Sequence, residues 1–340
     1  DLGAARGIVG DDDSGRAYEG LGGLWRYMGQ QRDAFYACNE KWWIDGYEHI
    51  GETADPHAYA MMGDESSEAD LTHSRSFLAA ALLRRKHRCG RQRRAEAVDG
   101  AVGAGTKEGD VLLNDRAREL DMDLTQGSAA VIADRLVAMD LGAGVGRVTR
   151  GVLLPVAASV VLVEQSAKWQ QISRHYVCGG DGGGELSKAA ARCDFIQARL
   201  EAFIPPAPPL ASPPAGGKGD GHSDGSSGYD VVWIQWTLQY LIDVDVVGLL
   251  ARVRSCLAPH GRGMIVLKEN RPHMAPASSN GRKGRGDPTR FQMDTPKFGG
   301  RFDIARSDAH LAVLVELAGL AVECFEVWDE VGCYVLVVPE

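Results

Sequence analysis

The chain has 340 residues, of which 44% are hydrophobic, so it can bury one large core or two smaller ones. No apolar run reaches the roughly 20 residues that a membrane-spanning helix needs, and the composition is typical of a soluble globular protein. The formal net charge of −9 argues against general nucleic-acid binding, which depends on positive surface. Such a charge suits a cationic substrate or serves only solubility.

Cysteine and histidine spacing excludes the common metal motifs. The seven cysteines form no Cys-x-x-Cys pair, and the nine histidines include no pair with the spacing of zinc ligands. An odd, scattered set of cysteines is typical of reduced thiols in an intracellular protein. We therefore expect reduced thiols and no bound metal.

Residues 1–130 lack a regular alternation of strands and helices. Helices are expected around residues 24–41 and 73–86, laid on the rest of the protein. A basic run at 84–94 opens a segment, 84–128, that becomes rich in glycine and mixed charge. The run could be a nuclear signal or an RNA contact, but a solvated loop face is favoured. We interpret residues 1–130 as an N-terminal helical extension with a flexible insertion.

Residues 131–340 alternate strands with helices, which predicts an α/β fold with a doubly wound, Rossmann-like sheet of seven strands. Two segments interrupt it, near 205–228 and 275–288, and both have the composition of disordered insertions. The expected strands are 135–141, 159–164, 193–198, 229–234, 263–270, 321–328 and 332–339, the last two forming an antiparallel hairpin. The expected helices are 146–157, 166–177, 243–259 and 307–320, the last capped by Ser307 and ended by Gly319.

The stretch "MDLGAGVGR" at 139–147 follows the first strand and opens a helix. Its glycines have the spacing G-x-G-x-G, whereas a dinucleotide fingerprint has G-x-G-x-x-G. Glu164 ends the second strand, where a carboxylate can accept hydrogen bonds from ribose hydroxyls. The glycine spacing favours S-adenosylmethionine (AdoMet) over NAD, and the alternative is a glycine-rich turn with no cofactor.

The stretch "YDVVWIQW" at 229–236 combines a buried strand with two tryptophans. The strand should end at the carboxyl edge of the sheet, where doubly wound folds bind ligands. We expect Trp233 to pack in the core. Trp236 either lines a binding site, which is favoured, or is also part of the core.

These stretches, together with "MIVLKEN" at 264–270, "FYACNEKWW" at 35–43 and "SRSFL" at 74–78, resemble one family. It is the AdoMet-dependent class I methyltransferase family that acts on protein N-termini beginning Xaa-Pro-Lys. The resemblance covers most of 35–85 and 131–338. The glycine loop is general to methyltransferases, whereas "WIQW" joined to the "KEN" strand is specific.

The resemblance implies roles for individual residues. Those assigned to the cofactor are Gly142, Gly144 and Arg147 at its methionine part, Glu164, Gln165 and Ser166 at its ribose, Leu200 and Glu201 at its adenine, and Gln235. Those assigned to the substrate are Trp43 and Trp236, which form the peptide channel, and Asn270, which holds the first residues. Asp294 is assigned as proton acceptor, in an acidic loop that also contains Asp303 as a possible partner. Tyr240 stands where many relatives have a histidine, and Glu201 where they have a glutamine.

The implied protein is an intracellular transferase of the nucleus and cytoplasm, a monomer whose partners are protein or peptide N-termini, with no nucleic acid and no membrane. Three alternatives stay open. One is a methyltransferase acting on a small molecule or a lysine side chain, because a fold does not determine the substrate. Another is a non-catalytic AdoMet-binding module. An NAD oxidoreductase is the most distant of the three.

Overall fold

The computed structural model describes residues 7–45, 64–97, 136–179, 190–209, 228–272, 289–296 and 300–339. Its centre is a seven-stranded sheet in the order β10-β11-β7-β6-β3-β4-β5. The strands are β3 (Val137–Leu141), β4 (Ser159–Glu164), β5 (Cys193–Gln197), β6 (Val231–Gln235), β7 (Met264–Asn270), β10 (Ala321–Trp328) and β11 (Val331–Val337). All seven expected strands are confirmed. Their apolar, β-branched runs suit a sheet that is covered on both faces.

The strand directions identify the fold. Strands β3 to β7 are parallel to one another, and the hairpin β10–β11 is antiparallel, with β11 next to β7. This is the class I methyltransferase fold that the sequence predicted. The order places the ends of β3 and β6 side by side, so the loops that follow these strands meet at one edge of the sheet.

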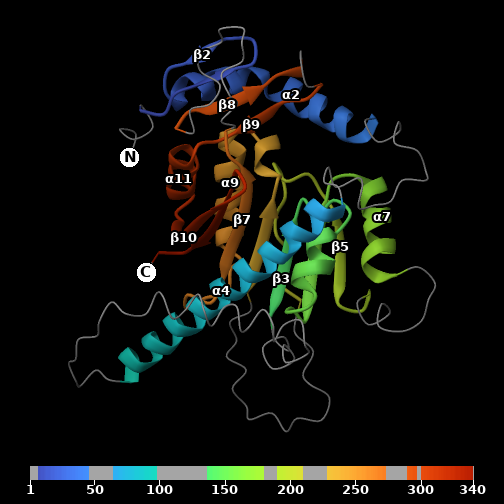
Figure 1. Ribbon diagram of the computed structural model, residues 1–340, viewed down its shortest axis with the longest axis vertical. Coiled ribbons are helices and arrows are strands. Elements are labelled where there is room, and N and C mark those ends of the chain that lie inside the picture. Colours follow the sequence, from blue (N-terminus) through green and yellow to red (C-terminus); the bar gives the residue numbers. More distant parts are fainter. Residues whose placement is uncertain are drawn as a thin grey trace.

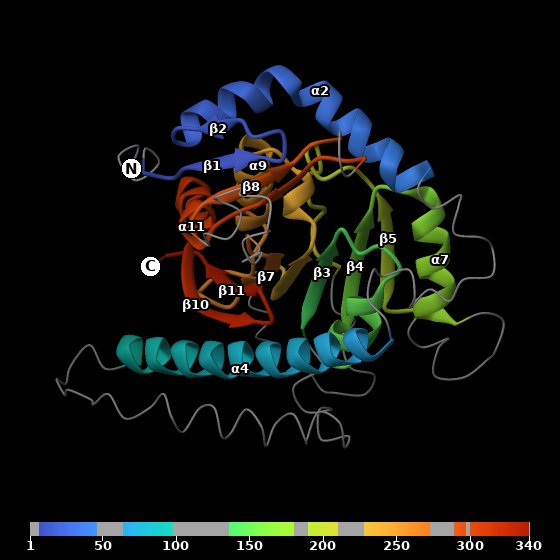
Figure 2. The same cartoon turned by 45° about the horizontal axis from the view of Figure 1, so that its top comes forward.

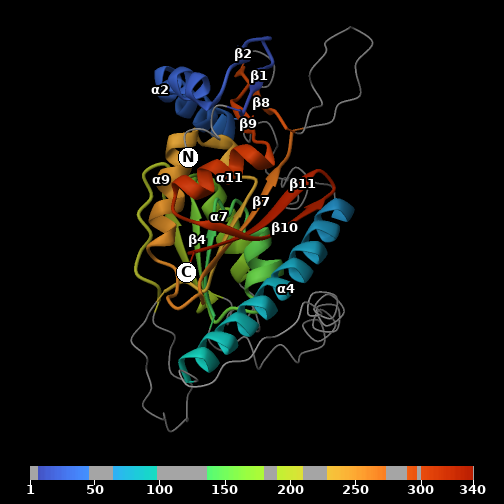
Figure 3. The same ribbon diagram turned by 90° about the vertical axis from the view of Figure 1, so that its left-hand side faces the viewer.

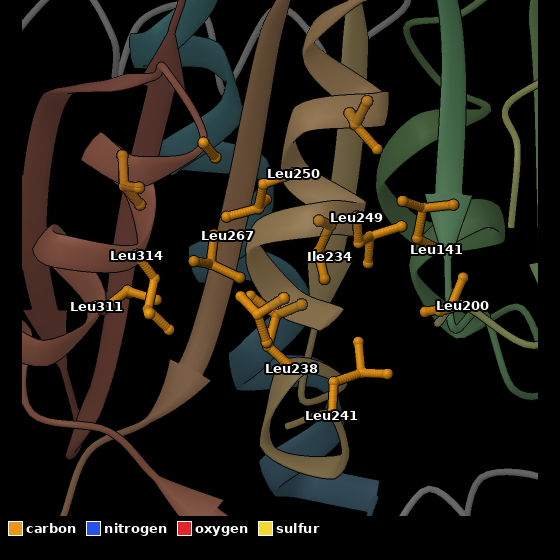
Figure 4. Packing of buried hydrophobic residues seen from close by; sticks show 14 of the residues in the cluster. Leu141, Leu200, Ile234, Leu238, Leu241, Leu249, Leu250, Leu267, Leu311 and Leu314 are labelled. Carbon is orange, nitrogen blue, oxygen red and sulfur yellow. The ribbon is translucent and has the colours of Figure 1, made fainter. Parts of the chain in front are cut away.

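Helices cover both faces of the sheet. Helix α4 (Asp64–Ala97) crosses one face, and helices α9 (Asp243–Arg254) and α11 (Asp308–Leu317) lie on the other (Figure 3). Helix α7 (Ala167–Cys178) lies beside β5 (Figure 1). Leucines of α9 and α11 belong to one buried cluster with leucines of the sheet, among them Leu250, Leu314 and Leu267 (Figure 4). Ser307 caps α11 as expected, since its Oγ accepts a hydrogen bond from the backbone N–H of His310 at 3.3 Å.

A second, four-stranded sheet was not expected. Its order is β2-β1-β8-β9, with β1 (Gly10–Asp12), β2 (Ala17–Tyr18), β8 (Phe291–Asp294) and β9 (Asp303–Ala305). It lies beside helix α2 (Leu21–Asp45) at one end of the molecule (Figure 2). The prediction that Asp294 and Asp303 belong to an acidic loop is therefore wrong, because Asp294 lies in β8 and Asp303 in β9, and the two strands form an antiparallel pair.

Two other expectations differ from the structure. The predicted start of the first insertion, residue 84, is too early, because the backbone of α4 stays helical to Ala97. The helix predicted at 146–157 contains a π-helical turn, η1 (Thr149–Leu153). A short 3₁₀ turn, η2 (Leu238–Tyr240), follows β6.

The remaining organisational predictions lie wholly or mostly outside the described residues. These are the boundary at residue 130, the insertion at 275–288 and most of the insertion at 205–228.

Helix α2 packs on the seven-stranded sheet domain, since its buried residues share one cluster with residues of β6, β7 and α9. None of the described helices is long and apolar enough to span a membrane.

Candidate active site

A cavity of about 410 Å³ lies where the loops after β3, β4, β6 and β7 meet the end of α2. Twelve of the fifteen residues assigned from the sequence line it. They are Trp43, Gly142, Gly144, Arg147, Glu164, Gln165, Leu200, Glu201, Gln235, Trp236, Tyr240 and Asn270. Parallel strands bring their carboxyl ends to one edge, which explains why residues so far apart in sequence converge.

The glycine loop and Glu164 form one end of this cavity. Glu164 Oε2 accepts a hydrogen bond from the Gly144 N–H at 3.0 Å, and Oε1 accepts one from the Ser166 N–H at 2.8 Å. Burial raises the pKa of Glu164, and these backbone N–H groups oppose the rise. Ser166 itself lies on a neighbouring cavity and caps α7 through its Oγ.

Asp70 of α4 is a site-supporting residue that the sequence interpretation missed. Its carboxylate accepts hydrogen bonds from Arg147 Nη1 at 2.7 Å, Lys268 Nζ at 2.6 Å and Gln235 Nε2 at 3.0 Å. Burial would raise the pKa of Asp70, but Lys268 and Arg147 outweigh it and the pKa is lowered. The carboxylate therefore holds two cavity residues, Arg147 and Gln235, in place.

One signal in the sequence could have revealed Asp70. It lies four residues before Ser74 and on the same helical face as Leu78 and Ala81, all of which are buried. A carboxylate on the buried side of a helix requires charged partners. The sequence does not say which partners these are, since Arg147 and Lys268 belong to other elements.

The Leu200–Glu201 pair, which follows β5, also lines the cavity. Glu201 Oε1 accepts a hydrogen bond from Arg199 Nε, and Arg199 Nη1 also pairs with Glu40 of α2 at 3.0 Å. The carboxylate of Glu201 is thus already engaged by an arginine. The same arginine therefore links Glu201 to Glu40 of helix α2.

Aromatic side chains form the other half of the cavity. Trp43 and Tyr240 contact each other edge to face, with ring centroids 5.2 Å apart. Trp236 has φ of 51°, a conformation that is strained for a bulky residue and that occurs preferentially at functional sites. Its indole Nε1 is buried and has no hydrogen-bond partner among the described residues. Trp233, in contrast, is fully buried in the core as expected, and its Nε1 donates to Gln235 Oε1 at 3.0 Å.

Glu269 explains why the chain takes this conformation after β6. Its Oε1 accepts the backbone N–H groups of Thr237 at 2.8 Å and Leu238 at 2.6 Å. Burial raises the pKa of Glu269 to about 7. The next residue, Asn270, lines the cavity and donates from Nδ2 to Gln239 Oε1 at 3.2 Å.

The two aspartates of the β8–β9 hairpin do not line the cavity. Asp294 is exposed on β8, and Asp303 is its partner across the two strands on β9. Among the described residues of the hairpin, Arg301 does line the cavity, and the sequence interpretation missed it. The cavity thus brings together most of the residues assigned to the cofactor with the aromatic residues, whereas neither aspartate lines it.

The residues at the glycine end fit AdoMet. Gly144 has φ of 54°, and a Cβ added to it would meet no atom within 4 Å, so this part of the loop faces open space. The adjoining carboxylate, Glu164, and the cation Arg147 are opposite charges that suit the hydroxyl and carboxylate groups of such a ligand. Among the described residues, no group of three histidine, cysteine, aspartate or glutamate side chains could hold a metal ion.

Comparison with known proteins points to the same cofactor. A family model described as AdoMet dependent proline di-methyltransferase matches residues 118–278. Alpha N-terminal protein methyltransferase 1 of Drosophila melanogaster is 33% identical over 135 residues, which is 39% of this chain and 39% of that protein. N-terminal Xaa-Pro-Lys N-methyltransferase 1 of Danio rerio is 30% identical over 173 residues, 51% of this chain and 64% of that protein.

The chain thus spans between 39% and 64% of the length of these two curated relatives. A solved SAM-dependent methyltransferase from Leishmania major is 19% identical with a TM-score of 0.46, over 97% of this chain and 96% of that one. Over these residues the chain is therefore similar to AdoMet-dependent N-terminal Xaa-Pro-Lys methyltransferases, and its seven-stranded sheet has the class I methyltransferase topology.

Proposed function

We propose that this chain transfers methyl groups from AdoMet to the α-amino group of protein N-termini, with the Xaa-Pro-Lys motif of its relatives as the first substrate to test. One observation carries the proposal. A single cavity joins the cofactor residues Gly144 and Glu164 to an aromatic wall that contains Trp43 and Trp236. A rigid aromatic face suits the ring of a proline in the second position of the substrate.

Catalysis of this methyl transfer requires mainly that the substrate amine and the methyl group of AdoMet are aligned. AdoMet supplies a methyl group on a sulfonium, which a neutral amine can attack in line. A free α-amino group has a pKa of about 7.7–8.0, so part of it is neutral near pH 7 without a strong base. Holding two reactants in line is itself a large catalytic effect. Asn270 would position the first substrate residues, while Trp43 and Trp236 exclude water from the amine.

Two residues, Tyr240 and Asp294, were assigned to the substrate amine. Burial raises the pKa of Tyr240, so this phenol stays protonated and can orient the amine but not take its proton. Asp294, the acceptor implied by the resemblance, is exposed and does not line the cavity. We propose Asp294 as the proton acceptor, and the Asp294→Asn variant tests this role. An unchanged kcat/KM across pH 6–9 would remove it from the mechanism.

The decisive experiment uses two peptides that begin Ser-Pro-Lys and differ only in N-terminal acetylation. Each is incubated with the chain and AdoMet and analysed by mass spectrometry. We expect the free peptide to gain mass in steps of one methyl group and the acetylated peptide to stay unchanged. Methylation of both peptides would point to the lysine side chain instead. Binding of AdoMet without methylation of any peptide would favour a non-catalytic module.

A further inference from the structure

The turn that follows β6 is held to β7 through three consecutive backbone donors. The Trp236 N–H donates to the backbone oxygen of Lys268 at 2.9 Å. The next two N–H groups, of Thr237 and Leu238, donate to Glu269 Oε1 at 2.8 and 2.6 Å. Trp236 lines the cavity, whereas Glu269 does not, so Glu269 acts on the site only through the backbone of this turn.

Glu269 can gain a proton without losing these two partners. The residue is 8% exposed, and its second oxygen, Oε2, is buried and makes no hydrogen bond among the described residues. A proton on Oε2 would leave both N–H groups bonded to Oε1 but remove the charge that strengthens the bonds. Hydrogen bonds to an ionised acceptor are roughly twice as strong as neutral ones. The protonation state of Glu269 therefore sets how firmly the turn is held.

Ionisable neighbours act on this carboxylate from three directions. Burial raises the pKa of Glu269 to about 7, the two backbone N–H groups and Arg306 oppose the rise, and the charge of Asp303 adds to it. Arg306 is itself paired with Asp243 at 2.8 Å. Burial raises the pKa of Tyr240, so this phenol stays protonated at neutral pH. Asp303, with a pKa of about 6, is thus the neighbour whose titration has to be separated from that of Glu269.

We propose that Glu269 is a positioning residue of the substrate site, whose ionised carboxylate holds Trp236 in the cavity wall and whose protonation weakens that hold. Trp236 has φ of 51°, and a strained backbone of this kind persists only where the surrounding bonds fix it. As the pH falls through neutral, the two bonds to Glu269 weaken and the Trp236 ring is less well ordered. A peptide that packs on this ring then binds less tightly, a consequence that rests on the proposed function.

Global stability should respond to pH in the opposite direction. A raised pKa means that the folded chain binds this proton more tightly than the unfolded chain does, for which the value is about 4.3. The stability that the protonated Glu269 contributes is full below that value and is lost as the pH rises through about 7. Weaker peptide binding on acidification is therefore a local effect at Trp236 and does not arise from unfolding.

The first test observes Trp236 directly and needs no substrate. The chain contains seven tryptophans, so it is labelled with fluorotryptophan, and Trp236→Phe identifies the Trp236 resonance by fluorine NMR. In the unaltered chain we expect this resonance to shift between pH 5.5 and 8.5, with a midpoint near pH 7. In Glu269→Gln, which mimics the protonated acid, it should not titrate. Asp303→Asn should lower the midpoint, because it removes a charge that raises the pKa of Glu269.

The second test measures peptide kinetics at two pH values. With a free Ser-Pro-Lys peptide at pH 8, Glu269→Gln should raise KM by about tenfold, roughly 1.4 kcal/mol, and leave kcat nearly unchanged. At pH 6 the two chains should have nearly equal KM, because Glu269 is then protonated in the unaltered chain. Comparing the chains at each pH cancels the titration of the substrate amine.

Glu326 of β10 offers a matched control for the loss of a carboxylate. It pairs with His73 at 2.7 Å, its side chain is 48% exposed, and it does not line the cavity. Glu326→Gln should leave both the Trp236 titration and the peptide KM unchanged at the two pH values. AdoMet affinity, measured by calorimetry, shows that each variant is folded.

The two tests separate the role of Glu269 from the proposed function. If no peptide is methylated but the Trp236 resonance titrates in the unaltered chain and not in Glu269→Gln, the proposed function fails and the positioning role stands. A Trp236 resonance that does not shift over this pH range overturns the role. So does an equal shift in Glu269→Gln, or a KM ratio that is the same at pH 6 and pH 8, since a purely structural contribution would not depend on pH.

Discussion

At the scale of single residues, the glycines at positions 142, 144 and 146 of the cofactor loop exclude a side chain for different physical reasons. A Cβ on Gly142 would lie 2.4 Å from Thr237 Oγ1, and one on Gly146 would lie 2.4 Å from Val177 Cγ2. Both positions are therefore required by close packing against the protein itself. A Cβ on Gly144 would enter open space, so glycine is favoured there by its positive φ of 54° and, if AdoMet binds along the loop, by the volume of the ligand.

The Gly144→Val variant should lose AdoMet binding by at least about a hundredfold, roughly 2.7 kcal/mol, because the side chain would occupy the ligand's volume. Calorimetric titration measures this. The Gly15→Val variant is the control for backbone strain. Gly15 also has a positive φ, 89°, and open space around it, but it lies in the β1–β2 turn and not in the cofactor loop. Equal losses of affinity in the two variants would mean that strain, and not occupancy, is the cause.

At the scale of elements, one buried carboxylate joins three helices. Asp243, in the first turn of α9, lies 2.6 Å from His310 Nε2 of α11 and accepts from Trp25 Nε1 of α2 at 2.7 Å. Arg306, which precedes α11, donates to it from Nε at 2.8 Å. Burial would raise the pKa of Asp243, but His310 and Arg306 outweigh it and the pKa is lowered. Its charge thus stabilises the packing of α2 and α11 on α9.

The Asp243→Asn variant should lower the free energy of unfolding by about 3–5 kcal/mol at pH 7, because it leaves Arg306 buried without its charge partner. A lowered folded pKa means that this contribution is full above the unfolded value, about 3.9, and is lost as the pH falls through the folded value. The difference from the unaltered chain, measured by urea unfolding, should therefore shrink below about pH 4.

Asp245 provides a graded control in the same turn of α9. Its ion-pair partner, Arg32, has a side chain that is 44% exposed, so Asp245→Asn should cost less. If Asp245→Asn destabilises the chain as much as Asp243→Asn, the buried network has no special importance for stability.

At the scale of the whole molecule, two distant segments form a layer next to the aromatic half of the cavity. Strand β1 pairs in parallel with β8, so residues near position 10 lie beside residues near 291. Phe35 of α2 stacks on Phe302 with centroids 5.1 Å apart, and Asn39 Oδ1 accepts the Phe302 N–H at 2.8 Å. Helix α2 and the hairpin that contains Arg301 thus depend on each other.

The Gly10→Ala variant should weaken this layer, because a Cβ on Gly10 would lie 2.5 Å from the ring and the backbone oxygen of Phe291. We expect a lower melting temperature and a higher peptide KM, with AdoMet affinity little changed. Gly22→Ala makes the same chemical change inside α2, where a Cβ meets open space, and should stabilise the helix by about 0.5–1 kcal/mol. A higher AdoMet Kd with an unchanged peptide KM in Gly10→Ala would show that the layer serves the cofactor instead.

Much of the fold and of the cofactor half could be predicted because it depends on local patterns. Runs of apolar, β-branched residues predicted the seven strands, and glycine spacing with Glu164 predicted the loop that meets them. Helix caps such as Ser307 are equally local. The burial of Trp233 and the place of Trp236 at the cavity followed from their positions, since Trp233 lies within the buried strand and Trp236 lies where the strand ends at the carboxyl edge of the sheet.

Only the tertiary structure decided the features that depend on pairing between distant elements. Strands β1 and β2 are three and two residues long, too short to carry a recognisable pattern, and form because β8 lies beside β1. Asp70 became part of the site because Arg147 and Lys268 fold onto it. The family resemblance implied roles for Asp294 and Asp303, but of these hairpin residues only Arg301 lines the cavity in the described part of the chain. The sequence does not determine which charges line a cavity, because the pairing and packing of distant elements decide which side chains face it.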